Sequence, residues 1–213
     1  MHFKLFIKNN SAVRKINLEN YLEISVQHTI MNSIVEKQAK AFEALKGKMG
    51  YKSIMQTPKI TKVIVNVGIG SLKDKKKQEI IINRLEKITG QKPSVRGSKQ
   101  SIASFKVREG DPVGLMVTLR GHRMNDFLEK MLNIALPRTR DFRGISAKGI
   151  DEMGNYSLGI KENTIFPETA DEEIKDVFGM SITFTTTAKT KEEAKAYFEY
   201  MDFPFKKEEE SKK

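Results

Sequence analysis

The stretch Lys59-Ile-Thr-Lys-Val-Ile-Val-Asn-Val-Gly-Ile-Gly70 decides the fold of this 213-residue chain. Five of its first eight residues are β-branched, which favours a β-strand over residues 59–66. Two glycines, Gly68 and Gly70, are typical of the turn that closes such a strand. The stretch therefore predicts a strand followed by a turn, and the patterns around it indicate what packs against that strand.

Helical spacing of apolar residues occurs in four segments, namely 33–50, 71–90, 125–136 and 190–201. The first and the last begin with a Ser/Thr-x-x-Glu capping box, at Ser33 and Thr190. Glycine at position 90 and proline at position 137 end the other two patterns. Four helices are therefore predicted.

Strand patterns occur in three segments besides the first. Residues 102–107 and 113–119 flank the turn 109–112 and predict an antiparallel hairpin. Residues 181–187 alternate apolar and hydroxyl side chains, which is typical of a strand with one solvated face. Residues 138–156 have no period and are expected to form a long exposed loop. Together these patterns predict an α+β fold in which helices cover one face of an antiparallel sheet and leave the other face open.

The formal charge of +11 is unevenly distributed. Residues 1–150 hold 29 Lys and Arg against 12 Asp and Glu, whereas residues 151–213 hold 9 against 15. Six basic residues and no acidic residue occur from Lys87 to Arg108, and eight of the nine arginines lie between Arg84 and Arg143. Because the guanidinium group matches phosphate geometry, this pattern favours a nucleic-acid partner for the first two thirds of the chain. A solvated basic face without a partner is the alternative interpretation.

Other protein classes are disfavoured by the composition. The chain has no cysteine, which excludes disulfides and thiol chemistry and favours a cytoplasmic location. Its apolar stretches are far shorter than the roughly 20 residues of a membrane-spanning helix. An enzyme would depend on Gly68-Ile69-Gly70, but the third glycine of a dinucleotide motif is missing. The three histidines are scattered, so we expect no metal, no cofactor and no catalytic centre.

Three residues of the predicted sheet would suit RNA on its open face. Asn66 and Thr118 could bond to sugars or base edges, and an exposed Phe105 could stack on a base. Spacing alone favours a different role for Phe105, because its apolar neighbours Ile102 and Val107 are typical of a core phenylalanine.

Nine strings of residues now point to a known family. They occur in the order in which bacterial-type large-subunit ribosomal protein five carries them, over a region from about Met31 to Lys207, and comprise residues 59–70, 90–93, 101–110, 117–121, 136–144, 154–157, 165–168, 185–189 and 203–205. The chain therefore resembles that family over most of its length.

This resemblance implies a structural constituent of the large ribosomal subunit that binds 5S rRNA in the central protuberance. With the charge window, it implies 5S rRNA contacts at Asn66, Gln91, Lys92, Arg96, Ser98, Lys99, Phe105, Lys106, Thr118 and Arg120. It further implies a loop toward P-site tRNA, formed by Arg108, Glu109, Gly110, Asp111 and Pro112. An intersubunit bridge to a head protein of the small subunit is implied at Arg140, Asp141, Phe142, Arg143, Asn155 and Tyr156. Large-subunit rRNA and neighbouring large-subunit proteins complete the expected partners, with no membrane.

The chain departs from the family pattern in three places. Gly97 and Gln100 stand where relatives commonly carry basic residues, and Asp151-Glu152-Met153 is more acidic than the family's form. Residues 1–30 have no counterpart in the family and are expected to be a leader. A transit peptide, a secretory signal and an upstream start or extension that adds unselected sequence are the alternatives, and the last is favoured because Met31 directly precedes a helix start. Organellar import stays open beside a ribosome-bound cytoplasmic protein. Residues 31–205 are expected to form one domain and residues 206–213 a disordered charged tail. A basic module for acidic membranes or for nucleic acid in general is the rival hypothesis.

Overall fold

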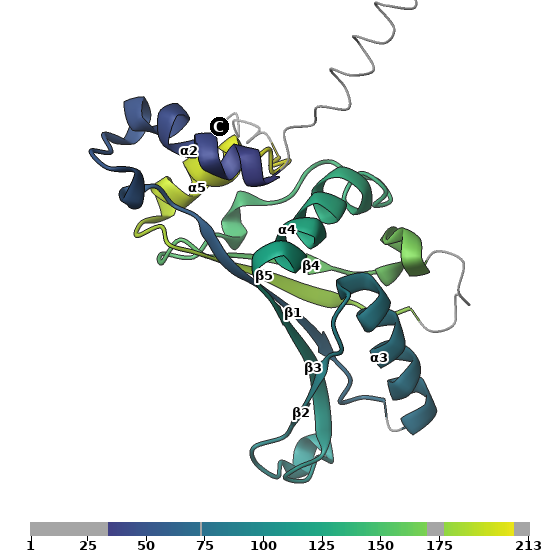
Figure 1. The fold of residues 1–213 in the computed structure, drawn as a ribbon. Helices are drawn as coiled ribbons and strands as arrows, with labels where there is room; N and C mark the ends of the chain where they lie inside the picture. The colour runs from purple at the N-terminus through teal and green to yellow at the C-terminus, as the bar shows by residue number, and fades with distance from the viewer. Residues whose placement is uncertain (1–33, 73, 170–176, 207–213) are drawn as a thin grey trace, which may run out of the picture.

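One antiparallel sheet dominates the computed structural model, which describes residues 34–72, 74–169 and 177–206. Within these residues it has five strands in the order β2-β3-β1-β5-β4 (Figure 1). Their bounds are β1 (Ile60–Gly68), β2 (Ser94–Gly97), β3 (Pro112–Leu119), β4 (Tyr156–Ile160) and β5 (Met180–Thr186).

The helices lie on one side of this sheet (Figure 1). They are α2 (Ile34–Met49), α3 (Lys75–Thr89), α4 (Gly121–Lys130), which continues as the π-helical turn Met131–Ala135, and α5 (Lys191–Tyr200). This arrangement confirms the predicted α+β fold, with helices covering one face. No helix in the described part of the chain is long and apolar enough to cross a membrane.

The expected signals mark two helix ends, at Gly90 and Thr190, whereas α4 begins at Gly121, before the expected start at residue 125. The Asp74 carboxylate accepts a hydrogen bond from Lys76 N at 3.0 Å at the start of α3, and Gly90 ends that helix at φ +66°. At the start of α5, Thr190 Oγ1 accepts from Glu193 N at 3.3 Å. Ser33, the first expected cap, lies outside the described residues, as do residues 1–30 and 207–213.

Alternate residues of the strands form the core beneath the helices. Val63, Val65 and Val67 of β1 are buried, and so are Leu115 and Val117 of β3. Toward β4 the core becomes aromatic, where the rings of Tyr156, Phe184, Phe198 and Phe203 pack with centroids 4.8–6.4 Å apart. Burial raises the pKa of Tyr156 to about 12.

The predicted strand over residues 102–107 is wrong. These residues instead form a 3₁₀ turn, Ala103–Phe105, closed by a bridge between Ile102 and Val107. Lys106 has φ +53°, a left-handed conformation that ends an extended run. The hairpin partner of β3 is β2, which the sequence patterns missed, and residues 98–111 form the loop between them. We call this loop the hairpin end.

The predicted long loop over residues 138–156 is only partly exposed. Ile145 and Ile150 are buried, and Ile145 pairs with the C-terminal segment through Ile145 N to Pro204 O at 2.8 Å and Lys206 N to Ile145 O at 2.9 Å. The last residue of this segment, Tyr156, begins β4, a strand that was not predicted. Contacts with residues about 60 positions away therefore fix a segment that has no local periodicity.

Candidate RNA interface

The open face of the sheet presents polar residues, together with apolar Ile64 and Met116, in rows that cross several strands. Asn66 of β1 pairs with Met116 of β3 on one side and with Ser181 of β5 on the other. In the next row Ile64 pairs with Thr118 and Thr183. The predicted contacts Asn66 and Thr118 thus share one face, in adjacent rows. Arg120 directly follows β3 and is exposed.

A shallow hollow of about 400 Å³ lies on this face next to Asn66. Gly68, Gly114 and Gly179 line it, and we call these three residues the glycine floor. Arg96 and Ser181 also line it, and Arg96 pairs with Gly114 across β2 and β3. A Cβ atom added to Gly68 would meet no atom within 4 Å, so the backbone is open to close approach from outside. An arginine beside exposed backbone is suited to bind a sugar-phosphate chain.

Phe105 lies on the hairpin end with 75% of its surface exposed. The interpretation as a core phenylalanine is therefore wrong, because the ring packs against little of the protein. Its neighbours Lys106 and Lys99 are exposed as well. The hairpin end consequently combines an accessible aromatic ring with basic side chains, which is the combination that binds unstacked bases and phosphates.

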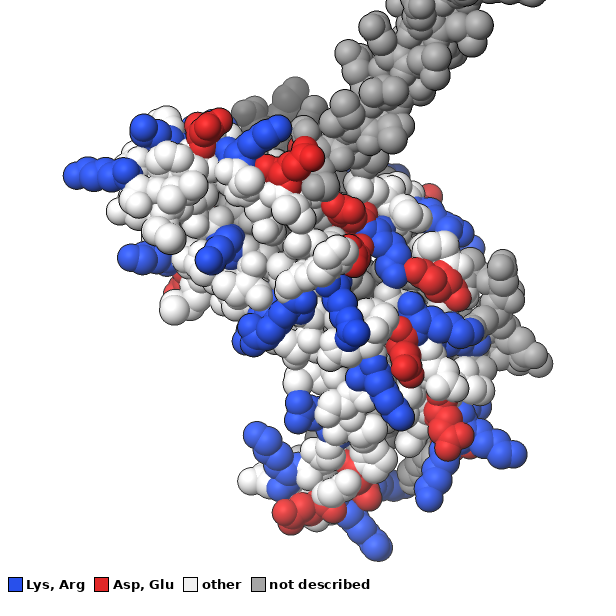
Figure 2. Space-filling view, in the orientation of Figure 1, with Lys and Arg blue, Asp and Glu red and all other residues white. Residues whose placement is uncertain are grey.

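The connection from α3 to β2 brings the remaining predicted contacts to the same end of the sheet. Thr89 Oγ1 donates to Gln91 O at 3.0 Å and fixes the start of this connection. Gln91 is half-buried and Lys92 is exposed, and β2 is exposed along its whole length. Figure 2 shows Lys and Arg side chains spread over this lower end of the molecule.

Hydrogen bonds within the hairpin end hold the predicted P-site tRNA loop in place. Arg108 N donates to the Asp111 carboxylate at 2.8 Å, Glu109 N to Ser101 Oγ at 3.0 Å, and Gly110 N to Ser98 O at 3.0 Å. Gly110 has φ +86°, which a side chain would strain. These hydrogen bonds fix the backbone of the loop, and all five residues from Arg108 to Pro112 are exposed.

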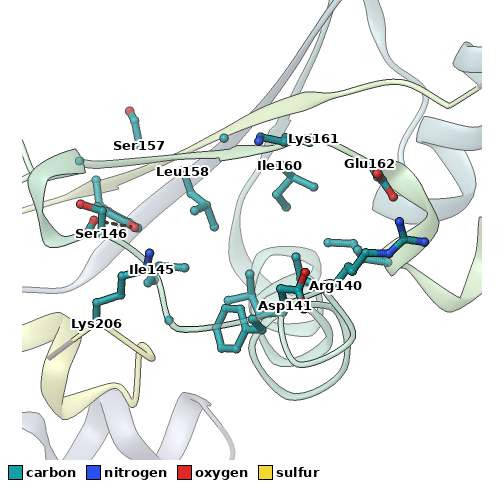
Figure 3. Close-up of a pocket in the computed structure, with 18 residues that line it drawn as sticks. Arg140, Asp141, Ile145, Ser146, Ser157, Leu158, Ile160, Lys161, Glu162 and Lys206 are labelled. Carbon is teal, nitrogen blue, oxygen red and sulfur yellow. Dashed lines mark hydrogen bonds between the residues drawn. The ribbon is translucent and has the colours of Figure 1, made fainter.

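The predicted bridge residues lie at the other edge of the sheet. Arg140, Asp141 and Arg143 are exposed and Phe142 is half-buried, near a hollow of about 630 Å³ between their loop and β4 (Figure 3). Leu158 and Ile160 point into this hollow from β4.

Two of the predicted bridge residues, Asn155 and Tyr156, make hydrogen bonds within the protein. The side chain of Tyr156 is 1% exposed and donates to Ser146 O at 3.2 Å, so contact between its ring and a partner is ruled out in this conformation. Asn155 accepts from Thr186 N at 3.3 Å and donates to the Asp151 carboxylate at 3.1 Å. We therefore remove Tyr156 from the candidate bridge surface.

The sequence analysis predicted a solvated face for residues 181–187 but named none of its residues as an RNA contact, and it missed most of the glycine floor. Ser181 and Thr185 continue the polar rows, and the Thr183 hydroxyl lies 3.2 Å from that of Ser157 on β4. Glycine inside a strand, as at Gly114, was the available signal, because it often marks close approach of a ligand. Among the described residues, no group of three or more His, Asp or Glu side chains could hold a metal ion.

Comparison with known proteins gives consistent matches along the chain. The family model described as "Ribosomal protein L5" matches residues 53–108, and the model of the "ribosomal L5P family C-terminus" matches residues 112–205. The large ribosomal subunit protein uL5 of Natranaerobius thermophilus is 55% identical over 162 residues, which cover 76% of this chain and 90% of its own. The uL5 protein of Chromobacterium violaceum is 53% identical over 176 residues, 82% of this chain and 94% of its own. That of Thermoanaerobacter sp. is 49% identical over 179 residues, 83% of this chain and all of its own.

Proposed function

The chain belongs to the ribosomal protein L5 family, a structural constituent of the large ribosomal subunit and not an enzyme, and we propose that it binds 5S rRNA with the open face of its sheet and its hairpin end. In this proposal it attaches 5S rRNA in the central protuberance. Membership of a ribosomal protein family itself associates the chain with rRNA and the ribosome.

The position of Arg96 beside the glycine floor is the observation that carries this proposal. The guanidinium can bind phosphate oxygens in two parallel hydrogen bonds, and the missing side chains at Gly68 and Gly114 let a ribose reach the sheet. Asn66, Thr118 and Ser181 supply amide and hydroxyl groups around the same place, suited to ribose hydroxyls and base edges. The face thus supports binding that depends on RNA shape as well as on charge.

Phe105 supports a second kind of contact at the hairpin end. Its exposed ring can stack on a base that is not paired in a helix, and Lys99 and Lys106 can neutralise the adjoining phosphates. In the proposal, the sheet face binds the RNA backbone while the hairpin end binds an unstacked base.

Two further contacts are proposed with other partners. Residues 108–112 would approach P-site tRNA. This proposal is supported by their exposed loop at the tip of the molecule, which hydrogen bonds hold in place. Arg140, Asp141, Phe142 and Arg143 would contact a head protein of the small subunit. The adjacent hollow, with apolar Leu158 and Ile160, supports a protein partner for that loop, because an apolar side chain could be buried there.

We also propose that residues 31–205 are a single domain, with residues 1–30 outside it. Lys206, expected as the first residue of a disordered tail, is instead hydrogen-bonded to this domain through Lys206 N to Ile145 O at 2.9 Å. The two segments matched by the family models contribute strands to one sheet, in which β1 from the first segment lies between β3 and β5 from the second. Separating these segments would leave both with unpaired strand edges.

Competition binding at near-physiological salt tests the 5S rRNA proposal. Labelled 5S rRNA is bound to the full chain and challenged with unlabelled 5S rRNA, tRNA and duplex DNA at one fixed salt concentration. Selective displacement by 5S rRNA is the expected result. Equal displacement by all three competitors would refute the proposal in favour of a general basic module.

A further inference from the structure

We propose that residues 22–30 of this chain dock as an additional strand on the outer edge of β4, beside the hollow between β4 and the loop 139–146. These residues precede the family-model matches, which begin at residue 53, and lie outside the described part of the chain. The inference does not depend on RNA binding and goes beyond the proposed function. Four observations carry it: an unpaired strand edge, an apolar hollow, and the sequence and attachment of the segment itself.

The outer edge of β4 offers backbone groups to another strand. Because β4 is the last strand in the sheet order, no strand among the described residues pairs with its outer side. An isolated bridge between Ile150 and Tyr156 covers the beginning of this edge. There Asp151 N donates to Asn155 O at 2.9 Å, so the backbone of Asn155 faces outward. Backbone groups alternate between the two sides of a strand, and Gly159 therefore faces outward as well, as a template for strand addition.

The hollow beside this edge is apolar on its β4 side. It measures about 630 Å³, and Leu158 and Ile160 point into it (Figure 3). Alternation along β4 puts both side chains on the face that also carries the buried Tyr156. Leu158 packs against the core but stays partly exposed. A neighbouring strand with apolar residues on the same face would cover Leu158, because cross-strand neighbours on one face pack together.

Residues 22–30 have the alternation that such a strand requires. Apolar residues occupy every second position, apart from His28, and polar residues stand between them. The apolar ones are Leu22, Ile24, Val26 and Ile30, and the polar ones are Glu23, Ser25, Gln27 and Thr29. A period of two puts the apolar side chains on one face of a strand. That face would fill the hollow beside Leu158 and Ile160, while the polar face would continue the open face of the sheet.

The charge of the segment complements the rim of the hollow. Residues 16–35 contain two acidic residues, Glu19 and Glu23, and no Lys or Arg, in a chain whose formal charge is +11. The charged residues that line the hollow are Arg140, Lys161 and Lys206 against Asp141 and Glu162. A net positive rim attracts an acidic segment, whereas the phosphates of a nucleic acid would repel it.

The segment joins the domain close to the hollow. Ile34, the first residue of α2, lies near the end of α4, because its N–H donates to Glu129 Oε1 at 2.9 Å. The helix that carries Glu129 continues through the π-helical turn to Leu136, which lines the hollow. At 1.5 Å per residue, Leu136 lies about 10 Å beyond Glu129. An extended chain from Ile34 back to Ile30 spans up to about 14 Å, which is enough to reach the hollow.

Docking of residues 22–30 would close the hollow in the free chain. The protein partner proposed for residues 140–143 would have to displace the segment before it could bury an apolar side chain against Leu158. The segment would then act as an internal competitor at that surface, and this consequence alone rests on the proposed function. An extension of unselected sequence, by contrast, would leave the edge of β4 open.

Hydrogen exchange of the full chain tests the docking. The outward N–H of Gly159 would bond to the segment, so we expect it to exchange about tenfold or more slowly in the wild type than in Ile24→Lys/Val26→Lys, which puts two charges on the apolar face. Leu5→Lys/Ile7→Lys is the matched control, because it adds the same charges elsewhere in residues 1–30. This control should exchange like the wild type. Equal exchange in the wild type and the first variant, or an equal loss of protection in both variants, would overturn the inference.

Cross-linking identifies what the segment contacts. Because the chain has no cysteine, Ser25→Cys creates a single site for a photoactivatable thiol reagent, and Asn9→Cys serves as the control. We expect position 25, but not position 9, to cross-link to β4 or to the loop 139–146, with a yield that dilution of the protein does not change. Cross-links to other parts of the chain, or a yield that falls on dilution because a second copy supplies the segment, would overturn the inference. Loss of 5S rRNA binding by the wild type would count against the proposed function and not against this docking.

Discussion

Replacing Phe105 with alanine separates RNA binding from folding more clearly than any other single change on this surface. Because 75% of the ring surface is exposed, the folded protein loses few contacts when the ring is removed. Deleting a fully buried phenylalanine costs about 3–5 kcal/mol, so the quarter of the ring that is covered corresponds to roughly 1 kcal/mol. If the ring stacks on a base, its removal should cost roughly 1–3 kcal/mol of binding free energy. That loss is about a 5- to 150-fold increase in Kd for 5S rRNA.

Two measurements on the same preparations test this prediction. Urea unfolding gives the change in folding free energy, and filter binding or fluorescence anisotropy at fixed salt gives Kd for 5S rRNA. Phe105→Trp should retain most of the affinity because a stacking ring is kept, whereas Phe105→Leu should lose it. Phe184→Ala is the contrasting control, since Phe184 is fully buried and its loss should destabilise the fold by about 3–5 kcal/mol.

A marked loss of stability in Phe105→Ala, with an unchanged Kd in the folded fraction, would refute the reasoning. The ring would then belong to the core of the protein in solution. An unchanged Kd together with unchanged stability would also refute stacking, because an exposed ring that contributes to neither property contacts no base.

Three further results are expected. Arg96→Ala should reduce the slope of log Kd against log salt concentration by about one unit, measured over about 50 to 300 mM salt, whereas Lys191→Ala on α5 should leave this slope unchanged. Equal slopes for the wild type and both variants would remove Arg96 from the phosphate contacts. Gly68→Val should leave the midpoint of thermal unfolding nearly unchanged, since the added side chain would enter open space. It should weaken 5S rRNA binding about tenfold or more, because the side chain would hold the RNA away from the sheet. Retained affinity would mean that the RNA does not approach the glycine floor. Burial raises the pKa of Tyr156 from 10.0 to about 12, so the stability that its neutral hydroxyl contributes is fully present below pH 10 and is lost as the pH rises toward 12. In urea unfolding from about pH 9 to about pH 11.5, the free energy of unfolding of Tyr156→Phe should therefore fall less steeply than that of the wild type. Parallel curves would contradict this.

Local patterns were sufficient to predict the helices and the three longest strands, β1, β3 and β5. Ile81, Leu85 and Ile88 share a helical face and are all buried in α3, because side chains at that spacing must lie on one side of a helix. Alternation in β5 likewise separates buried Ile182 and Phe184 from the open face. The acid-free basic segment from Lys87 to Arg108 and the nine segments that resemble the family could also be recognised from the sequence, because charge and residue order do not depend on which residues meet in space.

The same patterns failed where contacts between distant residues compete with local preference. Residues 102–107 look like a strand, but the bridge from Ile102 to Val107 and the left-handed Lys106 turn them into a compact loop. Tyr156 looked like part of an exposed loop, but four aromatic rings from β5, α5 and the C-terminal segment enclose it.

The sequence by itself determined the fold class, the positive charge of the first two thirds and the family. The tertiary structure decided which of these residues form a surface. Pairing of β1 with β3 and β5 brings Asn66 beside Met116 and Ser181, more than 100 residues apart at the extremes, and places Arg96 over glycines from other strands. Strand register sets these neighbours, and register depends on packing of the whole sheet against its helices, which no window of local sequence contains.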